Sequence, residues 1–127
     1  MTAPADILVI EDDAIVCEAI AEWLRVAGFS VRTANDGDAG LASVNSAVPA
    51  LVVTDIYMPG TSGAVVIGEL KQKHPEVPII AISALFESGY AINEAAAIAL
   101  GASRTLAKPF KRDELLAAVA ELLRKSR

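Results

Sequence analysis

Residues with chemically useful side chains stand where apolar or partly apolar stretches of the chain end: Glu11, Asp12, Asp55, Ser83 and Lys108. Carboxylates are preferred ligands of hard divalent cations such as Mg²⁺. A hydroxyl and an ammonium can neutralise oxygens on which charge develops. Taken alone, Asp55 is explained more simply as a turn residue, because Met58-Pro59-Gly60 follows it. The functional interpretation therefore depends on whether the chain brings these side chains together.

Strand and helix patterns alternate five times along the chain. Strands are predicted from apolar runs at residues 7–10, 29–34, 51–55, 77–83 and 103–107. Helices are predicted from apolar residues at helical spacing, from 14 to 27, at 38–46, from 65 to 73, at 91–100 and over the closing stretch from 113 to 125. This alternation predicts an α/β fold, a doubly wound five-stranded parallel sheet with helices on both faces and right-handed crossovers.

The carboxyl ends of parallel strands lie along one edge of the sheet, so these side chains are expected to converge there. Clustered carboxylates repel and raise each other's pKa values, and Mg²⁺ bound by Glu11, Asp12 and Asp55 would relieve the repulsion. Asp55 could then attack a phosphoryl group whose oxygens Ser83 and Lys108 hold. The strand ends together predict an Mg²⁺-dependent phosphoryl acceptor.

Other candidate residues have simpler structural explanations. Asp13 is expected to cap the helix that follows it rather than to bind metal. Trp23 falls on the apolar stripe of that helix and is expected in the core. His74 precedes Pro75 at a predicted helix end, so we expect it on the surface and not as a base or phosphodonor.

With these motifs in place, the chain resembles the receiver domain of bacterial two-component response regulators over essentially its whole length. The motifs that carry the resemblance are Ile-Leu-Val-Ile-Glu-Asp-Asp, Val-Val-Thr-Asp-Ile-Tyr-Met-Pro-Gly, Ile-Ser-Ala and Ala-Lys-Pro-Phe. The resemblance implies the flavodoxin-like receiver fold and phosphorylation of Asp55 by a histidine kinase or a histidine phosphotransfer protein. A downstream protein target would then read the altered surface.

The resemblance also implies roles for individual residues. Glu11 and Asp12 would be the metal-binding acids, with Asp12 the direct ligand and Glu11 acting through water. The backbone carbonyl of Tyr57 would be a further Mg²⁺ ligand. Ser83 would be the switch hydroxyl, and Lys108 would pair with the phosphate. The bond from that lysine to the following proline would be cis.

Two features depart from the family pattern. Receivers usually carry an aromatic residue three positions before the lysine, and here Thr105 stands there, so an aromatic switch is not expected. The interval between the switch hydroxyl and the lysine is also longer than in many relatives, and the extra length is expected in the loop 85–90. Tyr57 and Leu85 are bulky enough to shield an aspartyl phosphate from water.

Length and composition bound the function. The 127 residues, 54% of them hydrophobic, predict one receiver domain over 1–127 with no output domain; the alternative is a receiver fragment excised from a longer regulator or hybrid kinase. A net charge of −5 argues against direct nucleic-acid binding. No apolar run is long enough to span a membrane, and the lone Cys17 cannot form an internal disulfide, so we expect a cytoplasmic protein.

Two other functional classes fit less well. A phosphohydrolase would need a substrate pocket and a general acid near Asp55, and Met58-Pro59 supplies neither. A phosphorylation-independent relative of the receivers would be expected to lack some of the acids or the lysine, and all are present. We therefore expect a signalling module that catalyses only its own phosphotransfer and dephosphorylation, and not an enzyme with other substrates.

Overall fold

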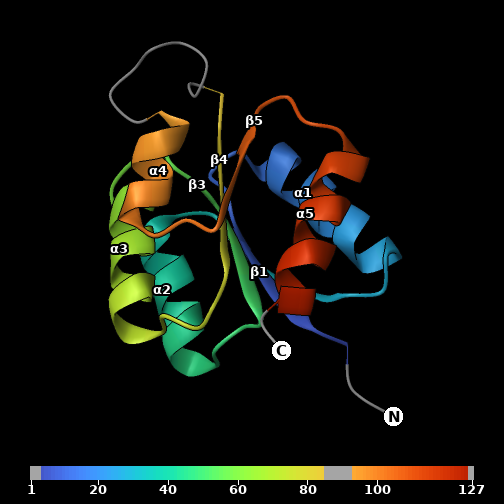
Figure 1. Ribbon diagram of the computed structural model, residues 1–127, viewed down its shortest axis with the longest axis horizontal. Coiled ribbons are helices and arrows are strands. Elements are labelled where there is room, and N and C mark those ends of the chain that lie inside the picture. The colour runs from blue at the N-terminus through green and yellow to red at the C-terminus, as the bar shows by residue number, and fades with distance from the viewer. Residues whose placement is uncertain (1–3, 85–92, 126–127) are drawn as a thin grey trace.

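The computed structural model describes residues 4–84 and 93–125. Their strands form a sheet in the order β2-β1-β3-β4-β5, and every neighbouring pair is parallel. Figure 1 shows the sheet nearly edge-on, between two layers of helices. The strands are β1 (Asp6–Ile10), β2 (Ser30–Ala34), β3 (Leu51–Asp55), β4 (Ile79–Ser83) and β5 (Arg104–Ala107). This arrangement confirms the predicted doubly wound five-stranded sheet.

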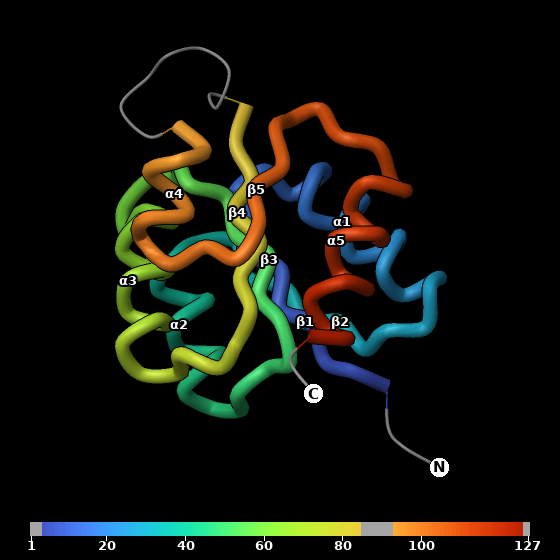
Figure 2. Tube along the Cα trace, in the orientation of Figure 1, coloured from blue at the N-terminus to red at the C-terminus, as the bar shows by residue number. Residues whose placement is uncertain are grey.

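Helices cover both faces of the sheet. They are α1 (Ala14–Val26), α2 (Gly37–Ser46), α3 (Gly63–Lys73), α4 (Glu94–Leu100) and α5 (Arg112–Lys125). As Figure 2 shows, α1 and α5 lie on one side of the sheet, and α2, α3 and α4 lie on the other. One apolar cluster joins Leu24 of α1 and Leu115 of α5 to the sheet. The second joins Val44 of α2, Val66 of α3 and Ala97 of α4 to the opposite face.

The burial of the strands follows their order in the sheet. The central strands β3 and β4 are buried along their whole length, which explains why their sequences are almost continuously apolar. The edge strands β2 and β5 are partly exposed. Asp55 and Ser83 are the last residues of β3 and β4, so they stand as buried polar groups at the carboxyl edge of the sheet.

Helix ends follow the side-chain chemistry of the sequence. Asp13 caps α1, as predicted, because its Oδ1 accepts hydrogen bonds from two backbone N–H groups of the first turn at 3.0 and 3.2 Å. Gly28 has a φ of 103° just after α1, a conformation that glycine adopts without strain. The α2 helix begins at Gly37, one residue before its predicted start, because Asp36 supplies the cap.

Some predicted boundaries differ from the structure by one or two residues. β4 begins at Ile79 rather than at residue 77, because the N–H of Val77 closes a turn on the carbonyl of His74 at 3.0 Å and Pro78 has no N–H. β2 begins at Ser30 rather than at residue 29. His74, predicted on the surface, is instead half-buried, with 25% of its side chain exposed.

The predicted loop 85–90, including Leu85, lies outside the described residues, as do the first two residues of the predicted helix 91–100. The described part of that helix starts at Glu94 and is capped by Asn93, whose side chain accepts from a backbone N–H at 2.8 Å. Within 4–84 and 93–125, none of the helices has the length and apolar character that crossing a membrane requires.

Candidate functional site

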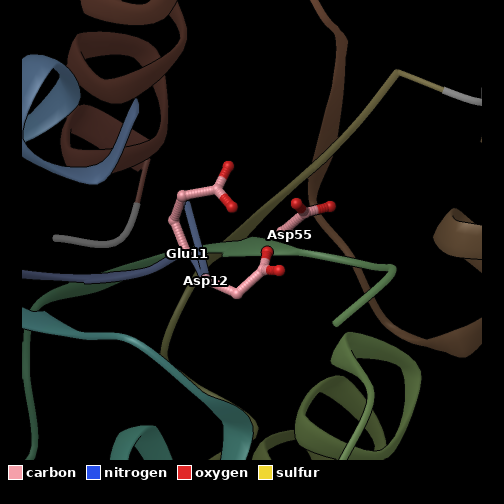
Figure 3. Close-up of side chains that lie close together, drawn as sticks. All are labelled: Glu11, Asp12 and Asp55. Carbon is pink, nitrogen blue, oxygen red and sulfur yellow. The ribbon is translucent and has the colours of Figure 1, made fainter. Parts of the chain in front are cut away.

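Three carboxyl groups gather at the carboxyl edge of the sheet. β1 and β3 are neighbours, and Ile10 pairs with Thr54, so the acids that follow these residues come side by side. Ligand oxygens of Glu11, Asp12 and Asp55 lie within 4.8 Å of one another (Figure 3). The structure thus brings together the three acids that the sequence pattern singles out.

The three carboxyl groups differ in exposure. Glu11 is fully buried and Asp55 is only 6% exposed, whereas Asp12 lies at the surface. Partial burial raises the pKa of Asp12 above its usual 3.8, and the hydrogen bond and negative charge of Glu11 raise it further, against weaker opposing effects of a backbone hydrogen bond and of Lys108. The acids therefore crowd one another electrostatically, which is the condition that a bound cation relieves.

The ammonium group of Lys108 bridges two of the acids. Its Nζ donates hydrogen bonds to Oε1 of Glu11 and, at 2.9 Å, to Oδ2 of Asp55. Burial lowers the pKa of Lys108, but the hydrogen bonds and charges of the two carboxylates outweigh burial and raise the pKa above its usual 10.5. The lysine is therefore charged at neutral pH and serves as the counterion of the acids.

Local backbone contacts orient the lysine and Glu11. The N–H of Lys108 donates to the carbonyl of Ser83 at 3.0 Å, which extends the pairing of β4 with β5 beyond Ala107. The bond between Lys108 and the following proline is cis, as predicted. The N–H of Asp13 donates to Oε2 of Glu11 at 3.2 Å. One oxygen of Glu11 is thus held by the start of α1 and the other by the lysine.

Ser83 and Tyr57 both belong to segments next to Asp55: Ser83 ends the neighbouring strand β4, and Tyr57 is in the loop that follows β3. Ser83 is buried and ends β4, one position beyond Ile82, which pairs with Asp55. Tyr57 is 36% exposed, and its N–H donates to Oδ1 of Asp55 at 3.3 Å. A Cβ on Gly63 would lie 1.9 Å from the carbonyl oxygen of Asp55. A larger residue at that position would displace the end of β3.

Three contacts of the site go beyond the sequence pattern. The pattern indicates Lys108 as a partner of phosphate, and the structure adds its contact with Glu11. Asn35 donates to the backbone carbonyl of Glu11 at 3.2 Å, a contact that no motif of the sequence indicates. Asp38, in the first turn of the next helix, accepts from Thr61 at 2.6 Å. The sequence signal for the last two contacts is a group of polar residues, Asn35, Asp36 and Asp38, directly after β2, the strand that pairs with β1.

Comparison with known sequences matches residues 7–120 to the response regulator receiver domain family. The chain is 37% identical over 120 residues to the transcriptional regulatory protein DltR of Streptococcus agalactiae serotype III. It is 36% identical over 125 residues to the transcriptional regulatory protein PrrA of Mycobacterium tuberculosis. These alignments cover 94% and 98% of this chain, and it spans about half the length of these relatives, 52% of each.

Comparison with solved structures extends over nearly the whole chain. The receiver domain of NtrX from Brucella abortus is 35% identical with a TM-score of 0.85, covering 94% of this chain and 98% of that one. A putative response regulator from Chloroflexus aurantiacus is 30% identical with a TM-score of 0.86 at the same coverage of both chains. Sequence and fold therefore lead to the same group of relatives.

Proposed function

Because the chain belongs to the response regulator receiver domain family, we propose that it is a phosphoacceptor module of two-component signalling or of a phosphorelay. Asp55 takes up the phosphoryl group in the presence of Mg²⁺, and a partner protein reads the phosphorylated surface. The observation that carries the proposal is the acid cluster of Glu11, Asp12 and Asp55 with Lys108 bound to two of its members. Such an acidic pocket is typical of phosphoaccepting receivers, which are not classical enzymes.

In the proposed transfer, a carboxylate oxygen of Asp55 attacks the phosphorus of a phosphohistidine. The O–P bond forms as the P–N bond breaks, and the imidazole nitrogen keeps the electron pair and takes up a proton. Lys108 already lies 2.9 Å from Oδ2 of Asp55, so it can exchange a carboxylate contact for a phosphoryl oxygen. The hydroxyl of Ser83 can donate to a second phosphoryl oxygen. The product is an aspartyl phosphate whose oxygens these two residues hold, with the ammonium of Lys108 balancing part of the negative charge.

The acid cluster fits a hard divalent cation. Mg²⁺ usually binds through one or two carboxylates and keeps waters or phosphate oxygens as its other ligands. We propose that Asp12 and Asp55 are direct ligands, that Glu11 acts through water and that the backbone carbonyl of Tyr57 completes the protein's contribution. Bound there, Mg²⁺ would neutralise charge on the phosphoryl oxygens.

An apolar groove beside Lys108 offers a surface for the phosphodonor. The groove has a volume of about 370 Å³, and its walls include Ile15, which is 83% exposed, and Trp23. Trp23, predicted in the core, is half-buried: it packs against the core cluster beneath α1 and α5 and also forms part of this wall. Its ring meets that of Phe110 edge-on, with 6.3 Å between the ring centroids. Because the groove reaches Lys108, a donor helix seated there would bring its histidine towards Asp55.

The partners follow from the family and from charge. Receiver domains take phosphate from histidine kinases, and we propose a histidine kinase or a histidine phosphotransfer protein as the donor. The downstream target is proposed to be a protein, because a net charge of −5 disfavours contact with a phosphate backbone. Cys17 is a buried free thiol whose pKa is raised by burial, which fits the proposed cytoplasmic location.

Phosphorylation by acetyl phosphate with Mg²⁺, followed by intact-mass spectrometry, tests the proposal. The wild type should gain one phosphoryl group that hydroxylamine removes, and Asp55→Asn should gain none while keeping its fold. Asp113→Asn neutralises an exposed aspartate of α5 and is the matched control, which should label like the wild type. Undiminished labelling of Asp55→Asn would assign the phosphate to another residue.

A further inference from the structure

Residues 34–38, where β2 ends and α2 begins, contact both halves of the acid site. One half is the end of β1, which carries Glu11 and Asp12. The other half is the loop 56–62 between β3 and α3, which follows Asp55 and carries Tyr57. These two halves come from separate parts of the chain, so their spacing depends on what lies between them.

The first contact is with the end of β1. The N–H of Glu11 donates to the carbonyl of Ala34 at 3.0 Å, and the side-chain amide of Asn35 donates to the carbonyl of Glu11 at 3.2 Å. Both backbone groups of Glu11, its N–H and its carbonyl, are therefore hydrogen-bonded, one to the last residue of β2 and the other to the residue that follows it.

The second contact is with the acceptor loop. The hydroxyl of Thr61 donates to Oδ1 of Asp38 at 2.6 Å. Beside this bond the two backbones touch, because a Cβ on Gly37 would lie 2.4 Å from the carbonyl oxygen of Thr61. The loop has its own closure at Ile56, whose carbonyl accepts from the N–H of Gly63 at 2.8 Å. Thr61 thus ties a closed loop to the start of α2.

The segment itself is fixed in place. Asp36 caps α2 by accepting from the N–H of Ala39 at 2.7 Å. Gly40, one turn into the helix, packs so tightly on β1 that a Cβ there would lie 2.4 Å from Cδ1 of Ile10. Because Ile10 directly precedes Glu11, this contact packs the start of α2 against the strand that leads into the acids.

We propose that residues 34–38 act as a brace that sets the spacing between the two halves of the metal site, with Asn35, Asp38 and Thr61 as positioning residues. The inference rests on the proposed function, since it concerns the site that binds Mg²⁺ beside Asp55. The brace orders the acceptor loop before the cation arrives, so the binding free energy of Mg²⁺ does not include the entropy cost of ordering this loop. Once Mg²⁺ is bound, the ion itself holds the loop, and the rate of phosphotransfer at saturating Mg²⁺ no longer depends on the brace.

Calorimetric titration of Mg²⁺ into the phosphate-free protein tests the brace. Thr61→Val removes the hydroxyl at nearly constant shape and should raise the Kd by about three- to tenfold, the range expected for one net hydrogen bond. Thr61→Ser keeps the hydroxyl and should bind Mg²⁺ like the wild type. Thr33→Val, an equal change at an exposed position of β2, is the matched control. Labelling by acetyl phosphate at saturating Mg²⁺ should proceed at the wild-type rate in all three variants.

A double-mutant cycle separates the brace from the charge of Asp38. Asp38→Ala and Thr61→Val remove the same hydrogen bond, so the double variant should lose no more Mg²⁺ affinity than the weaker-binding single variant. Asp38→Asn keeps an acceptor oxygen without the charge and should lose less affinity than Asp38→Ala.

Additive losses, or equal losses in Thr61→Val and Thr61→Ser, would overturn the brace. A wild type that takes up phosphate while Thr61→Val binds Mg²⁺ normally would overturn the brace and leave the proposed function standing. A wild type that neither binds Mg²⁺ nor is labelled would overturn both.

Discussion

Nζ of Lys108 lies 2.9 Å from Oδ2 of Asp55, so the charge of the proposed acceptor is paired before any phosphoryl group arrives. The same ammonium donates to Glu11, whose carboxyl group is fully buried. A buried acid without a counterion is costly, so the lysine stabilises the strand ends as well as serving the proposed chemistry. An incoming cation therefore competes with the ammonium of Lys108 for the carboxylates, and an incoming phosphoryl group competes with the carboxylates for that ammonium.

Lys108→Met should destabilise the metal-free fold and tighten Mg²⁺ binding. Loss of the ammonium leaves Glu11 buried without its counterion, which should lower the free energy of unfolding by about 2–4 kcal/mol at neutral pH. The substitution also removes a positive charge that opposes a cation at the same carboxylates, so the Kd for Mg²⁺ should fall. Urea unfolding in the presence of a chelator and calorimetric titration measure the two effects.

Lys111→Met is the matched control for this substitution, because Lys111 is exposed and its hydrogen bonds at the start of α5 are made by its backbone N–H and carbonyl groups. It should leave both quantities unchanged. Equal stability of the Lys108→Met and Lys111→Met proteins would show that the two ion pairs contribute nothing to the fold.

Asp12→Asn should stabilise the metal-free fold at neutral pH. Partial burial, followed by the hydrogen bond and charge of Glu11, raises the pKa of Asp12 in the folded state, so folding disfavours its ionised form. As pH rises above 3.8 the unfolded chain loses this proton first, and the wild type loses stability up to the raised folded-state pKa. Below 3.8 both states hold the proton, and the substitution should change little.

Thermal unfolding of Asp12→Asn and the wild type, followed from neutral pH down towards 3.8, measures this difference. With Mg²⁺ present at neutral pH the order should reverse, because only the wild type keeps the carboxylate proposed as a direct ligand. A stability difference that does not change with pH would contradict the assigned electrostatic cause.

The fold could be predicted from stretches whose local pattern favours one kind of secondary structure. The run 51–53 is apolar on both faces, which favours a strand buried on both sides. Asp13 could be separated from the two preceding acids because a helical stripe begins directly after it. These local signals were enough to predict the parallel sheet and the edge at which the acids meet.

The pairings across the site could not be predicted in the same way. Lys108 and Glu11 are 97 positions apart, and Thr61 and Asp38 are 23 apart. No periodicity or turn motif encodes which of two polar residues on separate loops will touch, because that depends on how closely the backbones approach. In this chain the close approach is set by glycines such as Gly37, whose packing becomes visible only in the fold.

The output signal should pass through α4 without a rotating aromatic ring. Oγ1 of Thr105 donates to Oε2 of Glu94 at 2.7 Å, which joins β5 to the first turn of α4. Threonine is too small to fill or vacate a pocket as an aromatic ring does, so we expect α4 to respond when Ser83 engages the phosphoryl group. Amide exchange with and without beryllofluoride as a phosphate mimic should show altered protection over 94–100.

Two variants define this response. Ser83→Ala should still accept phosphate but should lose most of the change in α4. Thr105→Val removes the hydroxyl at similar volume, so it should loosen α4 in the absence of phosphate and keep the response to the mimic. A response confined to residues around Asp55, with α4 unchanged, would contradict this route.

The aspartyl phosphate should be comparatively long-lived, because hydrolysis needs a water in line with the O–P bond and Tyr57 limits its approach. Tyr57 stands two residues after the proposed acceptor, is 36% exposed and donates its N–H to Asp55. Its ring offers neither the carboxylate nor the amide that would position a water.

Tyr57→Asn supplies an amide and removes the ring, and should speed loss of phosphate about tenfold if about 1.4 kcal/mol of barrier is removed. Tyr57→Phe keeps the ring and should decay like the wild type. The rates follow from intact-mass spectrometry at fixed Mg²⁺ after removal of acetyl phosphate, and equal rates in Tyr57→Asn and Tyr57→Phe would end the shielding role of this side chain.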